Sequence, residues 1–419
     1  MNELITYSNG LRLVVNRNPS VRSVAAGIWV GAGSAEETAD NNGISHFTEH
    51  VMFKGTDKLN AFEIANAFES IGASVNAFTG KEATCYYAKS IDEYAEKCFE
   101  KLSHIFTRSA FKAEELDKER KVIIEEINMV EDAPEDICFD LLAGTLYENS
   151  PLGRTILGPI ENVKRFTRND VSAYMDELYN ADNIVVSFSG NIAAGEADKL
   201  VRKYLLGEIR SNKTVKKEKK SIAVKGGCAV RIKDFEQSNI GISYKSLEFR
   251  HPMIPAQNIF NTIFGGSMGS RLFQRVREQL GLAYSVYSSP LAYVKNGNFN
   301  IVLNITAANT EKALRAVKNE IDRVVAEGVT REEFEKAKIQ LKSAFVFSEE
   351  SVQNMMTSQG KFMLLANELY SVDKRIEEID AITLNDVNEF IKTTFTGGNV
   401  CAAYVGKETG VDVLGIIKG

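Results

Sequence analysis

Two histidines four residues apart, His46 and His50, are the side chains whose type and spacing most clearly suggest chemistry, and Glu49 stands directly before the second. On a helix, this spacing places both imidazoles on one face, one turn apart, with the carboxylate beside them. Neutral imidazoles bind zinc well, and a catalytic zinc site takes three protein ligands and leaves one position for water. The chain has only four histidines, which weighs against a chance pairing. The pattern therefore predicts a metal site that needs a third ligand from elsewhere.

The best candidate for the third ligand lies in residues 114–132, EELDKERKVIIEEINMVED, because neither the remaining histidines nor the scattered cysteines show a ligand pattern. This segment is predicted to be an amphipathic helix, and its apolar stripe contains Leu116, Val122, Ile123, Ile127 and Val130. Glu119 and Glu126, two turns apart, fall along the Val122–Ile123 part of the stripe, whereas Glu125 falls on the polar side. A carboxylate in an apolar stripe needs a partner, so we expect Glu126 to be the ligand.

An internal duplication indicates which elements position these residues. The segment TRNDVSAYMDELYNADNIVVSFSGN, from Thr167, matches TLNDVNEFIKTTFTGGNVCAAYVGK, from Thr383, without a gap. Each copy predicts a capped amphipathic helix, a turn and an apolar strand. We therefore predict two homologous domains, a zinc-binding domain at 1–211 and a domain without zinc at 222–419, joined by the lysine-rich segment 211–221.

Both domains are predicted to be of the α+β class, each with a mostly antiparallel or mixed β-sheet and helices packed on one face. In the first domain, strands are expected at 11–15 and 23–30 and helices at 60–72 and 92–107. Strands follow one another in pairs as often as they alternate with helices. This order argues against a doubly wound parallel sheet.

The second copy lacks every residue of the candidate site. Glu119 corresponds to Ala337 and Glu126 to Ala344, and the counterpart of the histidine segment, around 255–259, contains neither histidine nor glutamate. Independent surface residues would not be expected to disappear as a set. Joint loss therefore supports one shared site in the first copy.

The order His-x-x-Glu-His is the inverted zinc motif. With it, the blocks HFTEHVMFKGT, SVNAFTGKEATCYYAK, ERKVIIEEI, PLGRTILG and SRLFQRVREQLGLAYSVYS cover essentially the whole chain. In the presence and order of these blocks, the chain resembles the pitrilysin/insulinase family of zinc peptidases. The resemblance is closest to the processing-peptidase-like bacterial subgroup of that family. The resemblance implies that His46, His50 and Glu126 bind Zn²⁺, that Glu49 is the general base, and that Glu119 is a catalytic carboxylate supporting the site.

The same resemblance implies a mitochondrial processing peptidase-like fold and a zinc metalloendopeptidase acting on peptides or unfolded polypeptide. An edge strand at Asn76 and Ala77, in a hairpin predicted at 74–88, would pair with the substrate backbone. Arg277 and Tyr284 of the second domain would bind substrate; the alternative is a helix-surface arginine and a core tyrosine. Family members enclose a chamber with four such domains, so two chains are expected to form a homodimer.

Composition excludes other classes of function. The net charge is −6 and the sequence pI about 5.6, which gives no electrostatic footprint for nucleic acid. No apolar run of about 18 residues is present to span a membrane, and the N-terminal residues resemble neither a signal nor a transit peptide. The five cysteines are scattered and contain no Cys-x-x-Cys motif. We therefore expect a cytoplasmic protein with no nucleic-acid or membrane partner, and the family resemblance implies a bacterial one.

Three alternatives remain at this point. The first is a catalytically silent assembly protein, because related subunits of respiratory complexes keep the fold and lose the chemistry. The second is an S-ribosylhomocysteine lyase, which shares the inverted motif but uses cysteines that this chain does not place suitably. The third is a catalytic subunit that needs a separate homologous partner, which nothing in the sequence opposes.

Overall fold

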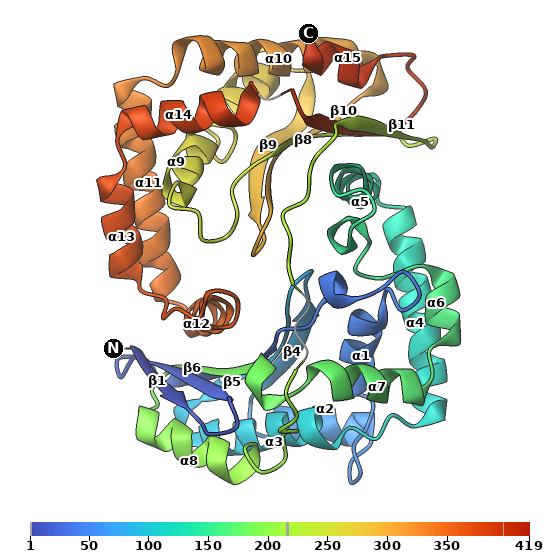
Figure 1. Ribbon diagram of the computed structural model, residues 1–419, viewed down its shortest axis with the longest axis vertical. Coiled ribbons are helices and arrows are strands. Elements are labelled where there is room, and N and C mark those ends of the chain that lie inside the picture. The colour runs from blue at the N-terminus through green and yellow to red at the C-terminus, as the bar shows by residue number, and fades with distance from the viewer. Residues whose placement is uncertain (1, 215–217, 397) are drawn as a thin grey trace. The chain divides into compact units, whose positions relative to one another are not determined.

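The computed structural model describes residues 2–214, 218–396 and 398–419 (Figure 1). Its contacts divide the chain into two compact units, each made of three segments. Unit 1 consists of Met1–Ile127, Thr155–Glu218 and Phe347–Val372, and unit 2 consists of Asn128–Arg154, Lys219–Val346 and Asp373–Gly419. The chain passes from unit 1 to unit 2 between Glu218 and Lys219, which lie inside the predicted linker 211–221. Residues 215–217 of this linker lie outside the described residues.

The sheet of unit 1 is mixed and has the order β1-β2-β6-β3-β5-β4. Its strands are β1 Asn2–Thr6, β2 Arg12–Arg17, β3 Ser23–Val30, β4 Ser74–Thr79, β5 Thr84–Ile91 and β6 Ile184–Gly190. Only β2 and β6 run parallel, and the other neighbours are antiparallel. β6 is buried along its whole length near the centre, whereas β4 forms one edge.

Within the residues that the structure describes, the sheet of unit 2 repeats this arrangement without a counterpart of β1. Its order is β7-β11-β8-β10-β9, and only β7 and β11 run parallel. The strands are β7 Gly227–Ile232, β8 Ser238–Lys245, β9 Ala283–Ala292, β10 Gly297–Ile305 and β11 Val400–Gly406. The edge strand β9 occupies the place of β4. The duplication predicted from the sequence is thus present at the level of sheet topology, and the α+β class is confirmed.

The duplicated helices begin with the same cap. Thr167 and Asp170 form a capping box at the start of α7 Arg168–Leu178, and Thr383 and Asp386 do the same for α14 Leu384–Phe395. The remaining helices before the linker are α1 Ile44–Met52, α2 Ala61–Glu69, α3 Ala95–Arg108, α4 Ala113–Glu131, α5 Pro134–Leu146, α6 Ile160–Arg165 and α8 Ala194–Tyr204. Those after it are α9 Ile254–Phe264, a π-helix Phe273–Gln279, α10 Thr310–Glu327, α11 Arg331–Glu349, α12 Val352–Ala366, α13 Val372–Ala381 and α15 Val413–Lys418. None of the helices in the described part of the chain has the length and apolar character needed to span a membrane.

Each sheet has a helix on its second face that comes from the other half of the sequence. In unit 1, the main core includes Ala26 and Ile28 of β3, while the alternate residues Ala25 and Trp29 face a separate cluster that contains Met356 of α12. α12 packs along β3 and β6, and in unit 2 α5 packs along β8 and β11 (Figure 1). The prediction of helices on one face is therefore incomplete, because an amphipathic pattern does not indicate which sheet a helix covers.

Candidate metal centre

The helix α1, which carries both histidines, is fixed at its start by a left-handed glycine. Gly43 has φ 100° at the N-cap, and a Cβ there would meet the carbonyl oxygen of Leu157 at 2.6 Å. Ile44, Phe47 and Val51 bury the opposite face of α1 in the core of unit 1.

A buried carboxylate holds the first turn of α1. Glu37 accepts hydrogen bonds from the backbone N–H groups of Gly43 and Ser45, both at 2.8 Å. It also accepts from the Asn42 amide at 2.8 Å and from the Ser45 hydroxyl at 2.5 Å. The Ser45 hydroxyl lies 2.6 Å from the Tyr174 hydroxyl of α7. A negative charge at a helix N-terminus also complements the helix dipole, so Glu37 anchors the helix that carries the candidate ligands.

Replacing Glu37 by alanine is expected to lower the free energy of unfolding by about 3 kcal/mol or more, because several buried donors lose their acceptor at once. Denaturant unfolding of the metal-free protein measures this loss. Glu63→Ala is the matched control, since Glu63 caps α2 in an exposed capping box, and it should cost only about 1 kcal/mol. Equal losses in the two variants would contradict the anchoring role of Glu37.

The helix α4 presents its glutamates as predicted, with one difference in its apolar stripe. Glu119, Ile123 and Glu126 share one face at helical spacing; Glu119 is only 5% exposed and Ile123 fully buried. Glu125 is exposed. Val122, however, is 50% exposed, so its predicted place in the buried stripe is wrong. The buried stripe of α4 is therefore narrower than predicted. It is centred on Ile123 alone, and not on Val122 and Ile123 together.

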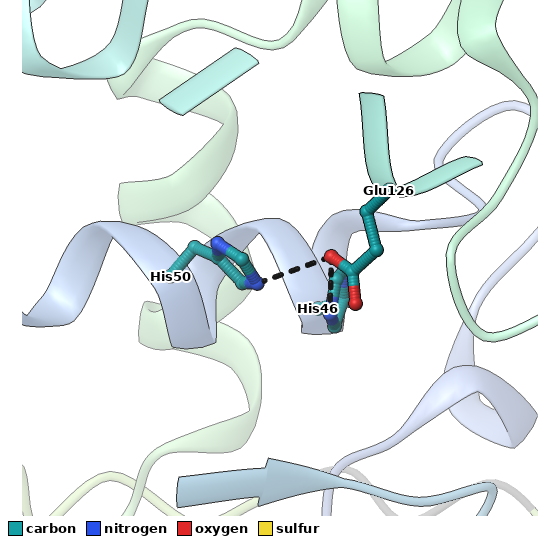
Figure 2. A group of neighbouring side chains, drawn as sticks. All are labelled: His46, His50 and Glu126. Atoms are coloured by element: carbon teal, nitrogen blue, oxygen red, sulfur yellow. Dashed lines mark ion pairs between the residues drawn. The ribbon is translucent and has the colours of Figure 1, made fainter. Parts of the chain in front are cut away.

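His46, His50 and Glu126 meet at one point, although their helices are far apart in sequence. Glu126 Oε2 lies 3.7 Å from His46 Nε2 and 3.5 Å from His50 Nε2, and one ligand atom from each residue falls within 4.8 Å of the others. Figure 2 shows the Glu126 carboxylate facing both rings, which stand on adjacent turns of α1. Ligands of a tetrahedral zinc ion lie about 3.4 Å apart, so the two spacings to Glu126 and the two-nitrogen, one-oxygen set fit Zn²⁺.

The imidazole of His50 is oriented by a carboxylate, which is itself bound by a lysine. His50 Nδ1 lies 3.1 Å from Glu119 Oε2, and because an ionised carboxylate only accepts, the ring donates there and turns Nε2 toward Glu126. Lys54 binds the other oxygen of Glu119 at 2.8 Å. Burial alone would raise the pKa of Glu119, but the bonds from His50 and Lys54 outweigh it and lower that pKa. This arrangement of ligand, carboxylate and lysine is typical of the outer shell of a metal site.

Burial shifts the pKa values of His46 and Glu49 in opposite directions, and in both residues it favours the neutral form. Burial, and secondly the neighbouring His50 ring, lowers the pKa of the His46 imidazole to about 3, so it remains in its metal-binding form at neutral pH. Burial likewise raises the pKa of the Glu49 carboxyl, although a hydrogen bond from Thr79 and the nearby His50 oppose this. A carboxyl group with a raised pKa beside three convergent ligands suits a general base.

Three polar residues around the site were not predicted from the sequence, namely Glu37, Lys54 and Thr79. Lys54 had a local signal, because it stands four residues after His50 and hence one turn further along the same face. Thr79 and Glu37 had none, since their contacts with α1 depend on the path of the chain between elements.

The predicted substrate residues lie at two different edges. Asn76 and Ala77 are on the edge strand β4, where the Ala77 N–H donates to the Asn76 side chain at 2.8 Å. In unit 2, Arg277 lies on the π-helix with its guanidinium 4.7 Å from the Phe273 ring centre. Tyr284, at the start of the edge strand β9, is 73% exposed. It is therefore not the core tyrosine of the alternative interpretation.

Comparison with known proteins gives consistent matches along the chain. Residues 12–160 match the insulinase family, peptidase family M16, and residues 165–341 match the peptidase M16 inactive domain. An uncharacterized zinc protease of Bacillus subtilis is 40% identical over 391 residues, which cover 93% of this chain and 95% of the relative. The second match includes the end of the first copy and residues 222–341 of the copy that lacks the histidines and glutamates of the site.

Two solved structures share the fold at low sequence identity. A structure described as the peptidase M16 inactive domain from Pseudomonas fluorescens has a TM-score of 0.91 at 18% identity and covers 97% of this chain and 98% of that one. A chain of Complex III2 from Candida albicans has a TM-score of 0.85 at 19% identity and covers 99% of both chains. At these identities the similarity establishes the fold alone.

Proposed function

Because the chain belongs to the insulinase family of peptidases, family M16, we propose that it is a zinc-dependent endopeptidase that hydrolyses peptides and unfolded polypeptide segments. The observation that carries this proposal is the convergence of His46, His50 and Glu126, with Glu49 on the same helix. The presence of the whole set argues against the catalytically silent alternative. It also argues against the lyase, which would use cysteine.

The residues of the site have separate tasks in this proposal. His46, His50 and Glu126 would hold the zinc, which when bound supplies a Lewis acid for the scissile carbonyl and for water. Glu49 takes a proton from the attacking water and returns it to the leaving amine. Glu119, itself held by Lys54, fixes the ring of His50. Asn76 and Ala77 on β4 offer main-chain groups for pairing with an extended peptide, which suits substrates of varied sequence.

The direct test combines metal analysis with peptide cleavage. We expect about one zinc per chain, loss of cleavage of quenched fluorescent peptides after chelation, and recovery when zinc is returned. Folded proteins containing the same cleavable sequences should resist, because a peptide must be extended to pair with an edge strand. Stoichiometric zinc without cleavage of any member of a peptide library would instead favour the silent homologue.

The proposed active assembly is a homodimer in which each zinc site uses Arg277 and Tyr284 from the other chain. Arg277 can hold a substrate carbonyl, and Tyr284 can donate a hydrogen bond to a developing oxyanion. The high exposure of Tyr284 supports a contact with another molecule. The rival proposal, a separate homologous partner, predicts that the purified chain alone is inactive.

Mixing two inactive variants tests action between chains. A Glu49→Gln protein mixed with an Arg277→Ala, Tyr284→Phe double variant should regain activity, because a heterodimer contains one site with both an intact base and an intact Arg–Tyr pair. Random pairing makes half of the dimers mixed, so activity should approach roughly a quarter of the wild-type level.

A tagged pull-down must confirm that the subunits exchange. Each variant mixed with itself is the control and should stay inactive. Absence of recovery despite confirmed exchange would mean that Arg277 and Tyr284 act within their own chain or not at all, and the proposed dimer would be wrong.

A further inference from the structure

A hydrogen bond joins the edge strand β4 to the helix α1 that carries the candidate base. The hydroxyl of Thr79, the last residue of β4, donates to Glu49 Oε2. In the described part of the chain, Thr79 is the only hydrogen-bond partner of the Glu49 side chain. The contact therefore fixes one carboxylate oxygen and leaves Oε1 to exchange a proton.

The alternation of β4 explains why the hydroxyl faces α1. Ser74, Asn76 and Phe78 are the exposed residues of the strand, and the residues between them are half-buried. Val75 and Ala77 pack on the core of unit 1, and Thr79 continues the same face. At the last position of this face, Thr79 presents a hydroxyl donor where Val75 and Ala77 present apolar groups. This hydroxyl faces the Glu49 carboxylate of α1.

The end of β4 is held in place by the loop that precedes α1. Ala35 N–H donates to the Lys81 carbonyl at 2.7 Å, and Ser34 N–H donates to the Gly80 carbonyl at 3.3 Å. Gly33 lies so close to this turn that a Cβ would collide with the Gly80 carbonyl oxygen. Thr79 thus stands on a fixed hairpin end, while the strand before it has an open edge.

From this geometry we propose that Thr79 is a positioning residue that couples peptide pairing at the β4 edge to the orientation of the Glu49 carboxylate. The inference rests on the proposed function, because it requires a peptide on β4 and a base at Glu49. A peptide that pairs with β4 adds a second neighbour to a strand that β5 holds on one side only, and the Thr79 hydroxyl transmits this added constraint to the base. Correct pairing of a peptide would therefore complete the site for proton transfer.

The first test removes the hydroxyl and keeps the shape. Thr79→Val should lower kcat by about 10- to 100-fold, the usual effect of losing a hydrogen bond to a charged group, with KM within about twofold and zinc content unchanged. Thr79→Ser, which restores the donor, should return kcat to within about threefold of wild type. Failure of the serine variant to recover would indicate a packing role and overturn the proposal.

Thr84 provides a matched control in the same hairpin. It is the cross-strand neighbour of Thr79 on β5, and its hydroxyl donates to the Ala32 carbonyl at 2.8 Å rather than to the site. Thr84→Val should lower stability but leave kcat unchanged. An equal loss of kcat in both valine variants would show that any lost hydroxyl in this hairpin has the same effect, which contradicts the proposal.

The second test measures the coupling itself. Methylating one backbone nitrogen of a peptide substrate weakens pairing with β4, and in the wild-type protein this should lower kcat as well as raise KM. In Thr79→Val the effect on kcat should largely disappear, because the link is already broken. Independent effects of the two changes would overturn the coupling.

The outcomes separate this inference from the proposed function. An active wild type with an unaffected Thr79→Val variant overturns the inference alone. A zinc-loaded wild type that neither binds nor cleaves peptides overturns the proposed function and the inference with it.

Discussion

Replacing Glu49 by glutamine is expected to lower kcat by about 10²- to 10⁴-fold while the protein keeps its zinc. The amide preserves the shape of the side chain and can still accept the hydrogen bond from Thr79. It cannot take up the proton that the attacking water must lose. Peptide cleavage under saturating substrate, with the zinc content measured on the same sample, tests this expectation.

Glu125→Gln is the chemical control for this experiment, because Glu125 is an exposed glutamate on α4. It should keep both zinc and turnover. Near-normal turnover by a zinc-loaded Glu49→Gln protein would remove Glu49 from the mechanism and leave the base unassigned.

The second large effect concerns the third metal ligand. Glu126→Gln should weaken zinc binding by more than about 100-fold, because loss of an outer partner of a ligand already costs about 10- to 100-fold. Glu119→Gln, which disturbs only the carboxylate behind His50, should fall in that smaller range. Competition with a chelator of known affinity ranks the variants without any need for activity.

Glu125→Gln again serves as the reference, since it stands one residue away from Glu126 on the exposed side of α4. It should bind zinc as the wild type does. A larger loss of zinc for Glu125→Gln than for Glu126→Gln would mean that the ligand face of α4 has been assigned one residue out of phase.

Features encoded by neighbouring residues could be predicted well from the sequence. The strand at 23–30 coincides with β3, and the repeated Thr–Asp pairs at 167 and 383 form the caps of α7 and α14. The convergence of His46, His50 and Glu126 could also be predicted, because a carboxylate on a buried helical face needs a partner and only one set of residues offered it.

Features that depend on the path of the chain could not be predicted. Nothing near α12 indicates that it covers the sheet of unit 1, about 160 residues after that sheet's last strand β6. The bond from Thr79 to Glu49 likewise arises between elements, and no repeat or spacing marks it. Val122 fits an apolar stripe by its type, yet it is 50% exposed, and no local signal separates it from the buried Ile123.

The late position of α12 in the chain has a consequence during synthesis on the ribosome. All six strands of the first sheet have been made once β6 is complete, but the helix over its Trp29 and Cys85 face follows only after most of unit 2. At 5–20 residues per second this interval lasts roughly 10–30 s. During that time the nascent chain carries an uncovered apolar sheet face, so a messenger truncated before residue 352 yields a product that chaperones or proteases must remove.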